Sequence, residues 1–213
     1  MGATRADAVR NRHALVEAAA AVFTARGLEV PLDDIARAAA VGNATLYRHF
    51  PTRTSLVEAV FEQVLNQIVE SARQYADEPD AWKAFEDHLT LLCGLQARDR
   101  GLADLLVTAF PAAPQIERLR SQALAGLNTL IASAQRKGVL RADFRHEDVV
   151  LILMANAGLL RRTREHAPDA WRRHLAFVLD GLRDTDASSA PALESGIESS
   201  MASWARELRC TDD

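Results

Sequence analysis

Apolar residues recur at intervals of three and four along almost the whole chain, and almost no stretch has the alternating pattern of a strand. In residues 52–77, for example, leucine, valine, isoleucine and phenylalanine form one wide stripe. This period places the apolar side chains on one face of an α-helix, which must then pack against other helices. The sequence therefore predicts an all-α fold.

Glycine, proline and short polar segments divide this pattern into separate helices. The helices are expected at residues 5–26, 31–39, 43–50, 52–77, 80–97, 101–109, 114–137, 146–166 and 169–185. A small, polar stretch after them indicates a linker, and one more amphipathic helix is expected beyond it. We therefore expect three parts: an N-terminal head at residues 1–53, a body at 54–186, and a linker with a C-terminal helix at 187–213.

Composition restricts the class of protein. The chain has 213 residues, 48% of them hydrophobic, which is enough for one or two small domains with a core. Two cysteines are too few for a disulfide framework, and the longest apolar run, residues 149–160, is too short to cross a bilayer. The first residues contain no apolar signal core. We therefore expect a cytoplasmic protein without a membrane segment.

One short segment, residues 43–50, lies between a glycine and a proline and is only two helical turns long. At about 100° per residue, Leu46 and Phe50 share one face of it and must pack inward. The other side chains point away or lie at the edges: Asn43, Ala44, Thr45, Tyr47, Arg48 and His49. Two short helices joined by a turn at residues 40–42, with an outward polar face on the second, form a helix-turn-helix. In that motif the second helix enters the major groove of DNA.

The local charge supports this interpretation more than the total charge does. The net charge is −4, which alone argues weakly against a nucleic-acid partner. Residues 35–57, however, contain three arginines and no carboxylate that would repel the DNA backbone. A surface helix that only closes a small bundle would have a similar pattern. The combination of helix lengths, turn and polar face favours DNA.

Three stretches carry a resemblance to a known family: ALVEAAAAVFTARGL, then LDDIARAAAV, then ATLYRHFPTRTSLVEAV. Over residues 9–60 the chain resembles the N-terminal domain of the TetR family of bacterial transcriptional regulators. The later stretches RGLADLL and KGVLRADFRHEDVVLIL resemble one subgroup of ligand domains in the same family. The resemblance implies a homodimer with an all-helical effector domain that binds a palindromic operator in double-stranded DNA, commonly as a repressor.

The resemblance also implies roles for single residues. Thr45 and Tyr47 match residues that usually touch DNA. His49 and Arg53 match residues that usually hold phosphates. Asn43 and Arg48 occupy variable positions at which family members read bases.

Three positions depart from the family pattern. Ala40 replaces the usual glycine of the turn, which costs about 1 kcal/mol if this residue adopts a left-handed conformation. Gly42 replaces the usual serine cap of the second helix and is a weaker cap. Asp33 stands where some members have a basic DNA contact, so that contact is not expected here.

The body offers many large apolar side chains and few isolated polar ones. A cavity with such a lining suits an apolar or aromatic small-molecule effector with one or two hydrogen-bonding groups. The candidate lining residues are Phe61, Trp82, Phe85, His88, Leu89, Leu92, Phe110, Met154 and Asn156. Each of them would equally suit the core of a helical bundle. An effector near Phe61 is expected to tilt the long helix at residues 52–77 and so move the head.

Other classes of protein are less well supported. No motif typical of a hydrolase, a nucleotide-binding enzyme or a zinc protease is present, and no two histidines have the spacing of metal ligands on a helix. We therefore expect no enzyme activity, no cofactor and no metal. Two alternatives stay open: a helical interaction or ligand-binding protein with no operator, and a regulator controlled by a protein partner.

The resemblance finally implies where two subunits meet. In the proteins that this chain resembles, the last two helices of the effector domain of each subunit form a four-helix bundle. Here these would be residues 146–166 and 169–185. The side chains expected in the seam are Leu159, Leu160, Trp171, Leu175, Val178, Leu179 and Leu182. The stripe after the linker, which includes Trp204, is expected to pack across or beside this seam.

Overall fold

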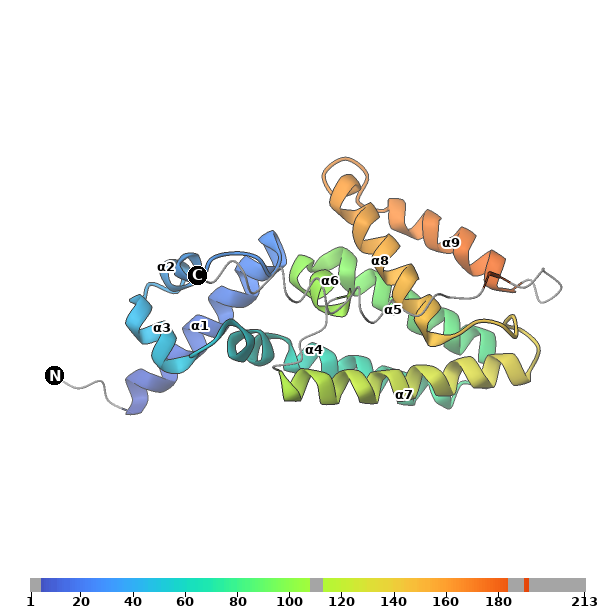
Figure 1. The fold of residues 1–213 in the computed structure, drawn as a ribbon, viewed down its shortest axis with the longest axis horizontal. Coiled ribbons are helices and arrows are strands. Elements are labelled where there is room, and N and C mark those ends of the chain that lie inside the picture. Colours follow the sequence, from blue (N-terminus) through green and yellow to red (C-terminus); the bar gives the residue numbers. More distant parts are fainter. Residues whose placement is uncertain (1–4, 108–112, 184–189, 192–213) are drawn as a thin grey trace.

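The computed structural model describes residues 5–107, 113–183 and 190–191. Within these ranges the chain forms nine α-helices and no strand, which confirms the expected all-α fold (Figure 1). The helices are α1 (Arg5–Arg26), α2 (Leu32–Ala38), α3 (Asn43–His49), α4 (Arg53–Ala76), α5 (Ala81–Arg98), α6 (Arg100–Val107), α7 (Pro114–Arg136), α8 (His146–Thr163) and α9 (Ala170–Arg183). The helix expected after the linker lies outside the described residues.

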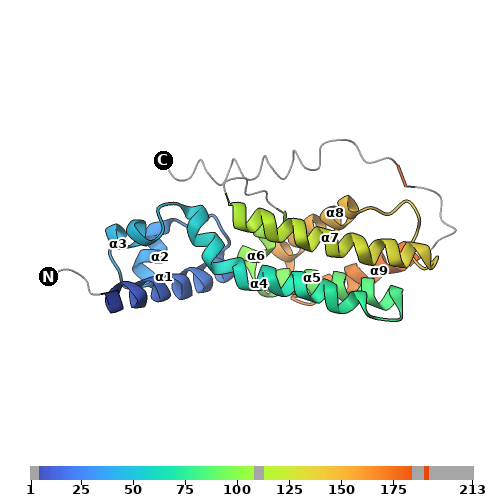
Figure 2. The same ribbon diagram turned by 90° about the horizontal axis from the view of Figure 1, so that it is seen from below.

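The helices are arranged as a small head and a longer body. α1, α2 and α3 gather at one end of the molecule (Figure 1). α4 leaves this head and runs into the body, where it lies alongside α7 (Figure 2). α5 packs against α4 and α7, and both α8 and α9 pack on α5. α6 follows α5 in the body and also packs against α1, so it connects the two parts.

The start of α4 is determined by its own capping residues. The Ser55 N–H donates to Thr52 Oγ1 at 3.1 Å, and the Thr52 N–H donates to Ser55 Oγ at 3.4 Å. This reciprocal capping satisfies backbone donors that have no partner within the helix. The helix that links head and body therefore begins at a defined residue, directly after α3.

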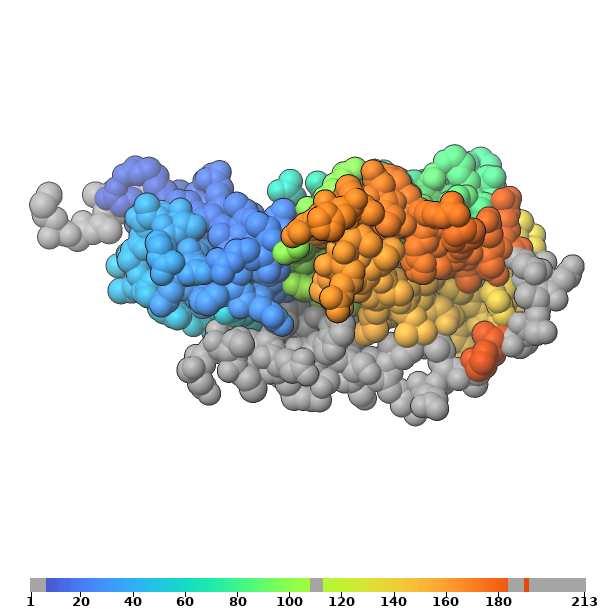
Figure 3. Space-filling model, turned by 90° about the horizontal axis from the view of Figure 1, so that it is seen from above, coloured from blue at the N-terminus to red at the C-terminus, as the bar shows by residue number. Residues whose placement is uncertain are grey.

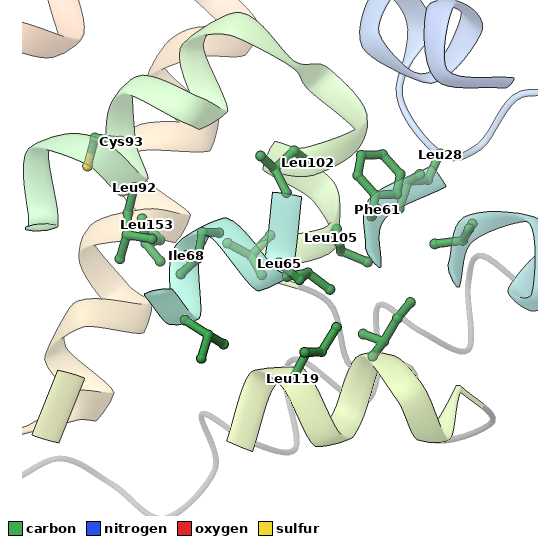
Figure 4. Packing of buried hydrophobic residues seen from close by; sticks show 14 of the residues in the cluster. Leu28, Phe61, Leu65, Ile68, Leu92, Cys93, Leu102, Leu105, Leu119 and Leu153 are labelled. Atoms are coloured by element: carbon green, nitrogen blue, oxygen red, sulfur yellow. The ribbon is translucent and has the colours of Figure 1, made fainter. Parts of the chain in front are cut away.

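The core of the body forms around one face of α4 (Figure 4). Phe61, Leu65 and Ile68 share this face and are buried. They pack among buried side chains of four other helices, namely Leu92, Leu102, Leu105, Leu119 and Leu153. α4 and α7 approach closely, since a Cβ atom added to Gly126 would lie 2.7 Å from the Cβ atom of Ala72. The far part of α4 is therefore held firmly within the body.

Aromatic packing joins the head to the body. Phe23 of α1 stacks on Phe61 of α4, with the ring centroids 6.1 Å apart. Gly101 of α6 lies against both rings, since a Cβ atom added to it would be 2.8 Å from Phe23 Cβ and 2.9 Å from Phe61 Cζ. Only a residue without a side chain allows α6 to come this close.

Two carboxylates next to Gly101 complete the junction. The Thr24 hydroxyl of α1 donates to Asp99 Oδ2 at 2.9 Å, and the Leu28 N–H donates to Asp104 Oδ2 at 3.0 Å. Burial raises the pKa of Asp104, although the bond from Leu28 acts in the opposite direction. The head therefore meets α6 through both apolar and polar contacts.

Candidate functional site

The turn between α2 and α3 has the geometry of a helix-turn-helix. α2 ends at Ala38, and Ala40 then adopts a φ of 54°. The Val41 N–H donates to the Ala36 carbonyl oxygen at 3.0 Å and closes the turn. A left-handed conformation costs an alanine about 1–2 kcal/mol. The chain therefore carries strain at the position where the family pattern has glycine.

α3 presents the faces expected from its sequence. Leu46 and Phe50 are buried in the head. Tyr47 is 48% exposed, and the remaining expected DNA-facing residues are exposed (Asn43, Ala44, Arg48) or half-buried (Thr45, His49). The helix thus presents Asn43, Thr45, Tyr47 and Arg48 on one outward surface, whereas the Nε2 atom of His49 is buried without a hydrogen-bond partner.

Arg12 of α1 is a candidate that the residue-by-residue interpretation missed. It is exposed, and its guanidinium carbon lies 5.0 Å from the centroid of the Phe50 ring, at the end of α3. The only signal in the sequence was the group of arginines near the start of the chain. Arg12 adds a positive charge beside the outward surface of α3.

Two aspartates of α2 affect this surface differently. Asp34 accepts hydrogen bonds from Arg26 at 2.7 Å and from Arg37 at 2.9 Å, which hold its pKa below the usual value. Its charge is therefore compensated within the head. Asp33 Oδ1 instead accepts a hydrogen bond from Asn43 Nδ2 at 2.8 Å. Asp33 therefore orients Asn43, but its own carboxylate is unfavourable near phosphates.

Arg53 lies inside the head, in contrast to its expected position at the DNA surface. The residue is only 7% exposed, and Nη1 donates to the carbonyl oxygens of Leu28 and Val30, both at 2.7 Å. These carbonyls belong to the loop between α1 and α2. The guanidinium therefore ties this loop to the first turn of α4, and this geometry argues against the expected phosphate contact.

The residues expected to line an effector cavity are spread along the body. Most of them are buried core residues: Phe61, Trp82, Phe85, His88, Leu89, Leu92 and Asn156. Phe61 contacts the head, whereas Phe85 packs against Trp82 and Phe144, with centroid distances of 6.0 and 5.5 Å. Met154 is half-buried, and Phe110 lies outside the described residues. The structure therefore brings only part of this set together.

Two buried polar residues of the set keep hydrogen-bonding capacity. Burial lowers the pKa of His88 to about 4, so its ring is neutral at pH 7, with Nδ1 3.4 Å from the Ser71 hydroxyl. Asn156 Nδ2 donates to Gln96 Oε1 at 2.8 Å, but Asn156 Oδ1 is buried without a hydrogen-bond partner. A buried unpaired acceptor is costly, so a ligand that donates to it gains free energy.

The side chains expected in the subunit seam lie at different depths in the structure. α8 and α9 form an outer layer of the body (Figure 3). Four of the expected seam residues are buried in their own subunit, namely Leu160, Trp171, Leu175 and Leu179, while Leu159, Val178 and Leu182 are half-buried. Phe177 and Leu151, which were not expected there, are 61% and 40% exposed. The exposed apolar surface of this layer therefore includes Leu151 and Phe177.

Two other kinds of feature are absent from the part of the chain that the structure describes. It contains no group of three or more histidine, cysteine or carboxylate side chains placed to hold a metal ion. None of its helices combines the length and the hydropathy needed to cross a membrane.

Two family profiles match the chain. The profile described as bacterial regulatory proteins of the tetR family matches residues 15–60, which include the helix-turn-helix. The profile described as the C-terminal domain of SbtR-like transcriptional regulators matches residues 80–184, which span α5 to α9. The matches therefore cover both the head and the body.

Individual regulators are similar to this chain as well. A TetR transcriptional regulator of known structure from Streptomyces coelicolor is 30% identical, with 81% of this chain and 98% of that chain covered and a TM-score of 0.51. The transcriptional repressor BepR of Brucella suis is 25% identical over 172 residues, or 74% of this chain and 82% of that protein. A regulator from Staphylococcus aureus is 33% identical over 75 residues, or 35% of this chain and 40% of that protein. With its helix-turn-helix head and all-helical body, the chain belongs to the TetR family of bacterial regulatory proteins and is a DNA-binding transcriptional regulator.

Proposed function

We propose that this regulator binds a palindromic operator as a homodimer and represses transcription until a small apolar or aromatic effector releases it. Operator binding is supported by the outward polar surface of α3, which follows the hydrogen-bonded turn between α2 and α3. A relative from Brucella suis is named a repressor, which supports the direction of the effect. Such a protein acts in the bacterial cytoplasm.

The DNA contacts follow from the exposure of each side chain. Arg48 is exposed on α3 and suits bidentate recognition of a guanine. Tyr47 and Thr45 offer hydroxyl groups to phosphate oxygens. Arg12 replaces the buried Arg53 as the arginine that holds a phosphate at the end of α3. Asn43, oriented by Asp33, reads a base at the start of the helix.

The homodimer uses the outer layer formed by α8 and α9 (Figure 3). Leu151 and Phe177 are large apolar side chains that this layer leaves exposed. Burying them against a second copy removes apolar area from water. The two recognition helices are then expected about 34–36 Å apart, so that they enter successive major grooves on one face of the DNA.

The effector binds within the body, near the buried polar groups of α5 and α8. Neutral His88 and the unpaired Oδ1 of Asn156 suit a ligand with one or two hydrogen-bonding groups on an apolar frame. Such a ligand releases DNA if it binds a displaced arrangement of α4 more tightly. A coupling of about 1–3 kcal/mol corresponds to a five- to 150-fold loss of operator affinity.

Selection of bound sequences from random double-stranded DNA tests the proposal. We expect a palindrome whose half-sites lie about one helical turn apart. In gel shifts, Arg48→Ala should weaken binding to this site by roughly 1–3 kcal/mol or relax one base position. Arg73→Ala is the matched control, because Arg73 is exposed near the body end of α4 and pairs with Glu70. Failure to recover any sequence, or equal effects of the two substitutions, would contradict the operator model.

A further inference from the structure

A groove runs along α5 where α9 packs against it, away from the helix-turn-helix. Its larger hollow has a volume of about 380 Å³ and its smaller hollow about 230 Å³. Thr90, Trp171 and Arg172 line both hollows, so the two hollows adjoin. The larger volume falls within the range of roughly 300–1,000 Å³ that is usual for small-molecule sites.

The larger hollow has an apolar wall. Trp171 of α9 lines it, and Gly94 of α5 makes room for the indole ring, since a Cβ atom added there would lie 3.5 Å from Trp171 Cη2. Leu91 and Leu95 of α5 line the same hollow. Trp171 itself is only 3% exposed, so the apolar surface that a ligand can cover is mainly that of the half-buried Leu91 and Leu95.

The charges around the larger hollow favour an anion. Its charged residues are Arg98, Arg172 and Asp87, and the Asp87 carboxylate is paired with Lys83. Arg172 lies over the Trp171 ring at 4.5 Å and donates from Nε to an exposed carboxylate, a bond that does not use its two terminal nitrogens. Asp169 compensates part of the Arg172 charge, so Arg98 and the two terminal nitrogens of Arg172 are the groups that can donate to an anion.

The smaller hollow does not share this preference. Arg183 lies 4.9 Å from the centroid of the Trp82 ring, which repeats the pairing of tryptophan and arginine. Glu86 and Asp180, however, line this hollow together with Arg172 and Arg183, so its charges balance. Within the groove, an anionic group therefore belongs in the larger hollow.

We propose that the larger hollow is a second small-molecule site, which binds an organic acid with a flat apolar or aromatic body. The body of the ligand packs against the half-buried Leu91 and Leu95, next to the buried Trp171. Its carboxylate lies between Arg98 and Arg172, where guanidinium groups match its geometry. The proposal rests on the groove alone and depends neither on operator binding nor on the effector region inside the body.

Binding of 2-naphthoate to the full chain tests the site, with 2-naphthylmethanol as the uncharged counterpart. The chain has three tryptophans, so the indole N–H signals of ¹⁵N-labelled protein can be assigned by single Trp→Phe substitutions. We expect 2-naphthoate to shift the Trp171 signal in a saturable manner. The alcohol should bind about tenfold more weakly, because it lacks the charge-assisted hydrogen bonds.

Matched arginine variants locate the carboxylate. Arg98→Gln and Arg172→Gln should each raise the dissociation constant of 2-naphthoate about tenfold, as expected for the loss of a charged hydrogen bond. Arg73→Gln removes the same charge from α4, close to Tyr75 of the hollow, and should leave the constant unchanged. The proposal is overturned if Trp171 does not respond, if the alcohol binds as tightly as the acid, or if the three variants behave alike.

Discussion

Replacing Arg53 by alanine separates its structural role from a role at DNA. Its Nη1 atom donates to the carbonyl oxygens of Leu28 and Val30, both at 2.7 Å, within the head. A hydrogen bond from a charged donor contributes about 1.5–3 kcal/mol, and a buried acceptor left unpaired adds to the loss. The two bonds share one donor atom, so their contributions do not add fully. We expect Arg53→Ala to lower the free energy of unfolding by about 2–4 kcal/mol.

Urea-induced unfolding, followed by far-ultraviolet circular dichroism, measures this loss. All proteins must be compared at one concentration, because the proposed dimerisation would contribute to the apparent stability. Arg48→Ala is the matched control, since it removes the same side chain from an exposed position on α3. Its free energy of unfolding should stay within about 0.5 kcal/mol of the original value. Arg53→Lys keeps the charge but loses the planar guanidinium, and its loss should lie between the two.

The opposite pattern would refute the reasoning. In that case Arg53→Ala would unfold at the same urea concentration as the original protein. It would also bind every DNA sequence more weakly, with the salt dependence reduced by about one phosphate contact. Arg53 would then contact the DNA backbone, and the buried arrangement would not be the one present on the operator.

Three further substitutions test other parts of the molecule. Ala40→Gly should raise the free energy of unfolding by about 1 kcal/mol, because glycine adopts a positive φ without steric cost; urea unfolding checks this. Phe177→Asp should convert dimers to monomers in sedimentation experiments, and a dimer that persists on dilution would exclude this face as the seam. Burial lowers the pKa of His88 from 6.5 to about 4, so the unfolded chain binds the proton more tightly. The stability that neutral His88 contributes is therefore complete above pH 6.5 and is lost as the pH falls towards 4, a loss of roughly 3 kcal/mol in all. In urea unfolding at several pH values, the His88→Leu variant should lack this part of the pH dependence.

The fold was predictable because its signals are local. The period of apolar residues in 52–77 is that of a helix, and the capping pair of Thr52 and Ser55 begins it within the chain itself. In α3, the spacing of Leu46 and Phe50 determines which side chains must point outward. These patterns depend on neighbours three or four residues away, so the sequence shows them directly.

The differences from the expected positions concern contacts between distant residues. Arg53 meets carbonyls more than twenty residues earlier in the chain, and nothing around it in the sequence distinguishes a buried guanidinium from an exposed one. Trp171 and Leu175 lie on the apolar face of α9, but periodicity does not say whether that face meets the same subunit or a second copy. Both are buried in their own subunit, and Phe177, outside the stripe, is the exposed one. Sequence periodicity therefore identifies buried faces more reliably than it identifies their partners.

The packing also changes how movement of the body must reach the head. We expected α4 alone to transmit movement of the body to the head. Leu28, in the loop between α1 and α2, is however hydrogen-bonded to both α6 and α4. Its N–H donates to Asp104 of α6 at 3.0 Å, and its carbonyl oxygen accepts from Arg53 of α4 at 2.7 Å. Phe61 of α4 also lies against Gly101 of α6, without room for a Cβ atom between them. A tilt of α4 that displaces Phe61 must therefore carry α6 with it or break the bonds at Leu28. Because the loop that contains Leu28 leads directly into α2, the first helix of the helix-turn-helix, we expect α4 and α6 to move the surface of α3 as a pair.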